Sequence, residues 1–64
     1  MILRFKTKVN SNGWRRYLAI DTDKKVFTTE CRSMIKDGEE VTAKAIRNIR
    51  TACENAGFTE TEAF

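Results

Sequence analysis

The feature that most constrains the fold is a run of alternating side chains near the start of the sequence. Residues 2–9, ILRFKTKV, carry apolar or small side chains at every second position and mostly basic side chains between them. A period of two is typical of a half-buried β-strand, which turns one face to the core and the other to solvent. We therefore expect a strand over residues 2–9.

An Asn-Gly pair follows this strand. Asn12-Gly13 is typical of a two-residue type I′ hairpin turn, because both central positions of that turn need a positive φ. In the resulting register the numbers of paired residues sum to 25, so Phe5 would face Ile20. The apolar side chains would then share one face of the hairpin and the basic ones the other. We expect the second strand to be WRRYLAI, residues 14–20.

Two further turns are predicted downstream. The segment DTDKK, residues 21–25, would reverse the chain and pair Phe27 with Ile20, again on the apolar face. The third strand is then VFTTECR, residues 26–32. Beyond it, Asp37-Gly38 indicates another turn, and a short fourth strand could come from Met34, Ile35 or Val41.

From residue 42 the apolar period changes to that of a helix. Apolar residues recur at spacings of 3, 4 and 3, at Ile46, Ile49, Cys53 and Ala56. Thr42 suits the N-cap, and Gly57 suits the position after the C-cap. The polar side chains lie on the opposite side, at Lys44, Arg47, Asn48, Arg50 and Glu54. Such an amphipathic helix should cover the sheet or a partner helix.

The predicted fold class is α+β, an antiparallel β-meander of three to four strands followed by one C-terminal α-helix. A chain of 64 residues has room for one core, so residues 1–64 should form a single domain. Domains of this size bury only about 60% of their unfolded surface and are therefore marginally stable. Association of copies is a common way to add stability. We expect a homo-oligomer, a dimer or a tetramer.

Composition excludes several kinds of site. Without histidine the chain has no histidine base or ligand, and Cys31 and Cys53 are not spaced for zinc. None of the three glycines belongs to a phosphate-binding loop, and no apolar run approaches the ~20 residues that cross a bilayer. We expect two reduced thiols in a cytoplasmic protein without membrane contact.

The acidic side chains Asp21 and Asp23 are the candidates for catalysis, with Glu30 as a further neighbour. Carboxylates bind hard cations such as Mg²⁺, and a metal-assisted cleavage of a phosphodiester would need little else. The same acids are also ordinary in an exposed hairpin turn. Whether the protein is an enzyme stays open, with metal-dependent DNA nicking as the most it could do.

Basic and aromatic residues gather in the first hairpin. Residues 1–16 contain five basic side chains and no acid, whereas residues 52–64 contain three acids and no base. Cationic grooves with aromatic side chains bind single strands, although an ordinary solvated sheet face also carries charges. The candidate nucleic-acid-binding residues are Arg4, Lys6, Lys8, Trp14, Arg15, Arg16 and Tyr17. We expect Trp14 and Arg16 at the hairpin tip, on the other side from the rest.

The order of elements resembles the single-stranded-DNA-binding fold of the transcriptional positive cofactor four family. The resemblance runs from RFKTKVNSNGWRRYLAID to EEVTAKAIRNIRTACENAG, and KDGEE between them is shorter than in that family. It implies a dimer that grips DNA across its β-ridges. The implied contacts are Arg4, Lys6, Lys8, Arg15 and Tyr17.

In size the chain is also similar to a clostridial-phage anti-CRISPR family that has this fold and is directed against type II-A systems. That family is associated with relaxing or nicking supercoiled DNA, so that the CRISPR nuclease engages its target poorly. This similarity implies DNA as the partner and gives Asp21 and Asp23 more weight.

A hypothesis of a different class is a protein-binding inhibitor. Such a protein would dock on a host defence protein through its sheet edge or its helix. Its charge would then only steer the encounter, and it would do no DNA chemistry.

Overall fold

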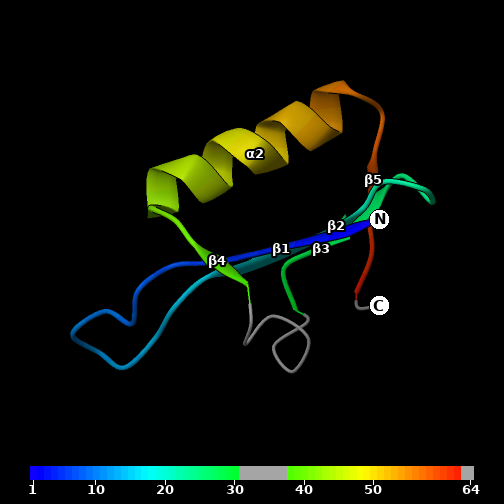
Figure 1. Cartoon of the computed structure of the whole chain (residues 1–64). Helices are drawn as coiled ribbons and strands as arrows, with labels where there is room; N and C mark the ends of the chain where they lie inside the picture. The colour runs from blue at the N-terminus through cyan, green and yellow to red at the C-terminus, as the bar shows by residue number, and fades with distance from the viewer. Residues whose placement is uncertain (31–37, 63–64) are drawn as a thin grey trace.

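The computed structural model of the protein describes residues 1–30 and 38–62. These residues form an α+β fold in which a helix packs over one face of a mixed sheet (Figure 1). No helix in the described ranges is long and apolar enough to span a membrane. The elements are β1 (Ile2–Lys6), β2 (Tyr17–Asp21), β3 (Val26–Thr28), β4 (Glu39–Glu40), α2 (Ala43–Asn55) and β5 (Thr59–Glu60).

The sheet is mixed, and the prediction of a purely antiparallel meander is wrong in this respect. Within the described residues it has five strands in the order β4-β1-β2-β3-β5. β1, β2 and β3 form the predicted antiparallel meander, whereas β4 pairs parallel to β1 and β5 pairs parallel to β3. Helix α2 carries the chain from β4 to β5, and strands joined by a helical crossover run parallel. The helix is therefore not the last element, because β5 follows it.

The register of the first hairpin differs from the prediction by two residues. Phe5 pairs with Leu18, and Leu3 with Ile20, so the numbers of paired residues sum to 23 instead of 25. Side chains alternate with a period of two, so a shift of two leaves each one on its predicted face. The prediction of an apolar face and an opposite basic face on β1 therefore survives the error in register.

The cause of the shift is the loop that joins the two strands. The side-chain Oδ1 of Asn10 accepts hydrogen bonds from the backbone N–H groups of Asn12 and Trp14, at 2.9 and 3.0 Å. Gly13 has a positive φ of 77°, but Asn12 does not, so the turn is not type I′. The asparagine that closes the loop is thus Asn10, which widens the loop beyond the predicted two residues.

The second hairpin has the predicted register, with Ile20 opposite Phe27. Strand β3 is shorter than predicted, since it ends at Thr28. Residues 31–32 of the predicted strand lie outside the described residues, as do Met34 and Ile35. Within the described part, the fourth strand is Glu39–Glu40, directly before the predicted candidate Val41.

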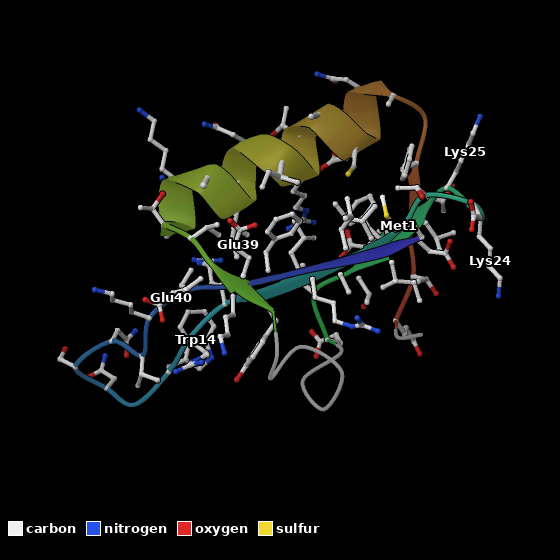
Figure 2. The ribbon with its side chains drawn as sticks, in the orientation of Figure 1. Met1, Trp14, Lys24, Lys25, Glu39 and Glu40 are labelled. Carbon is white, nitrogen blue, oxygen red and sulfur yellow. The ribbon has the colours of Figure 1, made fainter. Side chains whose placement is uncertain are left out.

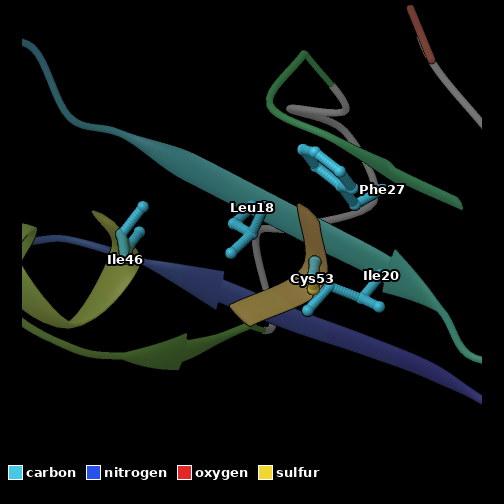
Figure 3. Packing of buried hydrophobic residues seen from close by; sticks show 5 residues of the cluster. All are labelled: Leu18, Ile20, Phe27, Ile46 and Cys53. Carbon is cyan, nitrogen blue, oxygen red and sulfur yellow. The ribbon is translucent and has the colours of Figure 1, made fainter. Parts of the chain in front are cut away.

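The core lies between the sheet and helix α2 (Figure 3). Its buried cluster consists of Leu18, Ile20, Phe27, Ile46 and Cys53. The helix contributes Ile46 and Cys53 from the predicted stripe, and Ile49 packs partly buried beside them. Ala56, the fourth predicted position, is exposed at the C-cap. Cys53 is a free thiol whose pKa is raised by burial and by the nearby Glu54, whereas Cys31 lies outside the described residues.

Both ends of helix α2 are capped as predicted. The hydroxyl of Thr42 accepts a hydrogen bond from the N–H of Ala45 at 3.0 Å. At the other end, Gly57 donates to the carbonyl of Glu54 at 3.1 Å and Phe58 donates to that of Cys53 at 2.9 Å. These two bonds form a Schellman motif, which satisfies helix carbonyls and needs a left-handed residue after the cap. Gly57 supplies it, with φ of 88°.

Replacing this glycine should destabilise the protein through the backbone alone. A Cβ at Gly57 would meet no atom within 4 Å, so a Gly57→Ala variant suffers only the strain of a left-handed conformation. We expect it to lower the free energy of unfolding by about 1–2 kcal/mol in urea denaturation. Gly57→Asn is the matched control and should lose less, because asparagine tolerates this conformation. Equal losses in both variants would contradict the argument.

Candidate nucleic-acid interface

The segment between β1 and β2 forms an arm that extends beyond the part of the sheet covered by the helix (Figure 1). We define the arm as residues 7–16. At its base Thr7 donates its N–H to the carbonyl of Arg16 at 3.1 Å, and its hydroxyl accepts from the N–H of Arg16 at 2.9 Å. The arm contains three basic side chains, Lys8, Arg15 and Arg16, and no acid. It is therefore a cationic projection.

Trp14 is the most unusual residue of the arm. Its side chain is not used in the core, and 51% of the residue is exposed. The guanidinium carbon of Arg16 lies 5.2 Å from the centroid of the indole ring, within the range of a cation–π interaction. A large exposed apolar side chain is informative in a small protein, because burial would have stabilised the fold. Here the indole ring is presented at the surface beside a cation.

Trp14 lines three hollows, and two of them lie between the arm and another part of the fold. The first, the arm groove, has a volume of about 700 Å³ and lies between the arm and residues 40–43. Trp14 and Glu40, which both line it, are labelled in Figure 2. The second, the arginine pocket, has a volume of about 160 Å³ and lies between the arm and helix α2. Three residues line both hollows: Trp14, Arg15 and Arg16.

The structure divides the predicted binding residues into two sets. Lys8, Trp14, Arg15 and Arg16 belong to the arm, and Tyr17 follows them at the start of β2 and lines the arginine pocket. Arg4 and Lys6 lie in β1, half-buried and opposite Ala19 and Tyr17, and line neither hollow. The Nε atom of Arg4 is buried without a hydrogen-bond partner. The arm and Tyr17 therefore form the candidate site, and Arg4 lies outside it.

Sequence analysis missed the helix as a contributor. Arg47 and Arg50 line the arginine pocket together with the arm. The sequence placed both on the polar side of the helix, but it gave no information on what that side would face. Their spacing of three residues puts them on neighbouring turns, which is the one available signal that they act together.

Asp21 and Asp23 lie at the other end of the sheet from the arm, at the β2–β3 turn (Figure 1), whereas Glu30, their expected neighbour, lines the arginine pocket. Asp21 Oδ1 accepts hydrogen bonds from the N–H groups of Asp23 and Lys24, at 3.0 and 3.1 Å. Asp23 Oδ2 pairs with the ammonium group of Met1 at 2.7 Å, which lowers the pKa of Asp23. Within the described ranges, no group of three or more potential ligands could hold a metal ion. Both carboxylates therefore have contacts that shape the turn.

The comparisons with known proteins identify no relative. No family model matches the sequence, and no curated protein or solved structure matches it. The function must therefore be argued from the residues and their arrangement alone.

Asp21 offers a test that separates turn formation from chemistry. Asp21→Ala removes the acceptor of two backbone N–H groups, so we expect the free energy of unfolding to fall by about 1 kcal/mol. Asp21→Asn keeps a side-chain oxygen for these bonds and should lose much less. Urea denaturation of both variants measures the difference. If the asparagine variant keeps its stability but loses a metal-dependent plasmid-nicking activity of the wild type, the carboxylate is catalytic.

Proposed function

We propose that this protein binds DNA through the arm. The observation that carries the proposal is the exposed indole ring of Trp14, with the guanidinium group of Arg16 beside it on an arm that contains no acid, although Glu40 and Glu30 line the hollows on their far sides. Residues 1–16, which include the arm, contain five basic side chains and none of the 9 acids of the chain. A surface of this kind attracts a polyanion, and its aromatic ring can stack on a base.

The size and the lining of the arm groove support the binding of a nucleic acid. The arm groove, at about 700 Å³, lies within the size range of sites that bind small organic ligands, so it can accept a nucleotide unit. Lys8 and Arg15 line it together with Trp14, which brings cations and an aromatic ring to one place. Phosphate contacts would supply affinity, and stacking would hold a base without reading its identity.

The similarity to the phage family supports a proposal for the wider biological role. In it, the protein acts in a phage-infected bacterium as an anti-CRISPR, and DNA held by the arm is a poorer target for the CRISPR nuclease. Self-association into a dimer or tetramer belongs to the same proposal. The small core supports self-association, because a chain of this size gains little stability from burial.

The tryptophan provides the test. It is the single tryptophan of the chain, so its fluorescence reports directly on the site. Titration with a short oligodeoxynucleotide should change the emission. Trp14→Ala should weaken binding roughly 5- to 150-fold, the loss expected for one stacked base, whereas Trp14→Phe keeps a ring and should lose less. With three arm cations on phosphates of a single strand, log K should fall with log salt at a slope near −2.

Two results would contradict the proposal. One is the absence of binding to either a single strand or a supercoiled plasmid at low salt. The other is equal affinity for wild type and Trp14→Ala, which would separate the binding from the arm. A complex with a host protein that survives high salt and nuclease treatment would instead support the protein-binding inhibitor.

A further inference from the structure

The arginine pocket is lined by cationic side chains that form no ion pair with the described residues. Arg15 and Arg47 line it and have no ion pair within residues 1–30 and 38–62. Arg16 lies over the indole ring, which leaves its charge without a carboxylate. Cationic side chains that approach one another repel unless an anion lies between them. One carboxylate, that of Glu30, lines the same pocket, so these three cations exceed the acid there, and the excess of positive charge favours an anionic ligand.

The fourth arginine of the pocket differs from the others. Arg50 Nη2 donates to Glu60 Oε1 at 2.8 Å, and Arg50 Nε lies 3.5 Å from Glu54 Oε1. It joins helix α2 to β5, and its charge is already balanced. Arg47, one turn earlier, has no such partner among the described residues. Of the two helix arginines, Arg47 is therefore the one that can bind an incoming anion.

The sizes of the two hollows suggest how they divide a ligand. At about 160 Å³, the arginine pocket has the space of roughly five water molecules, which is below the usual range for a whole organic ligand. A phosphate group fits this space, but a nucleotide does not. The arm groove is larger and is joined to the arginine pocket through Trp14 and its two arginine neighbours.

We infer that helix α2 is part of the DNA-binding surface, and that Arg47 holds a backbone phosphate of the strand bound by the arm. A base lies against Trp14 at the arm groove, and the adjacent phosphate enters the arginine pocket between Arg16 and Arg47. The acid Glu30 also lines this pocket and opposes the phosphate, so the attraction of Arg16 and Arg47 must outweigh it. This inference rests on the proposed function and adds the helix to the arm.

The test compares two substitutions that remove the same charge from the same helix. Arg47→Gln removes a cation from the pocket, whereas Lys44→Gln removes one that is exposed and does not line either hollow. With a fluorescein-labelled oligodeoxythymidylate, Arg47→Gln should weaken binding roughly 10-fold at low salt. It should also reduce the salt slope by about 0.7, the share of one phosphate on a single strand. Lys44→Gln should change the affinity less than about 2-fold and leave the slope unchanged.

A third variant gives a change of opposite sign. Glu30 is exposed, so Glu30→Gln should leave the fold intact. It should tighten binding, because it removes the acid that opposes the phosphate. Circular dichroism of all three variants checks that the helix is retained, which keeps a loss of binding separate from a loss of structure.

The outcomes distinguish the two proposals. If the wild type binds and Trp14→Ala weakens binding, but Arg47→Gln behaves like Lys44→Gln, the inference is overturned while the proposed function stands. If the wild type does not bind DNA, both are overturned. A selective loss of affinity and salt slope in Arg47→Gln supports the inference.

Discussion

The contact between the central strand β2 and helix α2 is the interaction on which the rest of the structure depends. Leu18 and Ile20 are buried on the face of β2 that meets the helix, and Ile46 and Cys53 are buried opposite them. The helix has 13 residues and is therefore about 20 Å long, and it runs over the sheet roughly along the strands (Figure 1). The strands directly before and after it, β4 and β5, lie at the two edges of the sheet. The position of both edge strands follows from this one packed contact.

The same contact explains how far the sequence could predict the fold. Period-two and helical patterns identified β1, β2 and α2, and the helix caps at Thr42 and Gly57 followed from residue type alone. The loop register was wrong because two asparagines flank Ser11, and the side chain of Asn10 was the one that organised the turn. Strands β4 and β5 have two residues each, too few to show any period. They are strands because the helix brings them to an edge, and no local pattern encodes that.

The candidate site, like the fold, could be predicted from the sequence only in part. Alternation and charge identified the basic and aromatic residues of the first hairpin but put Trp14 and Arg16 on the other side from the rest, whereas in the structure both line one pocket with Arg15 and Tyr17. The exposure of Trp14 depends on where the helix begins, since the strands continue as an arm beyond the end of the helix that starts at Ala43. The participation of Arg47 depends on the orientation of the helix over the sheet. The exposure of Trp14 and the position of Arg47 both depend on how distant segments pack, so neither could be predicted from a local sequence pattern.

Helix α2 connects the strands at the two edges of the sheet, and this connection has a consequence for aggregation. Val41 donates its N–H to the carbonyl of Lys6 at 2.8 Å on one edge, and Thr59 and Thr61 donate to those of Lys25 and Phe27 at 3.0 and 2.8 Å on the other. Both sets of bonds flank the same helix, so a fluctuation that lifts the helix uncovers β1 and β3 together. Uncovered strand edges are the templates on which sheets of different molecules join. Resistance to such joining is thus set by how firmly the helix stays docked, and the brief edge strands themselves add little to it.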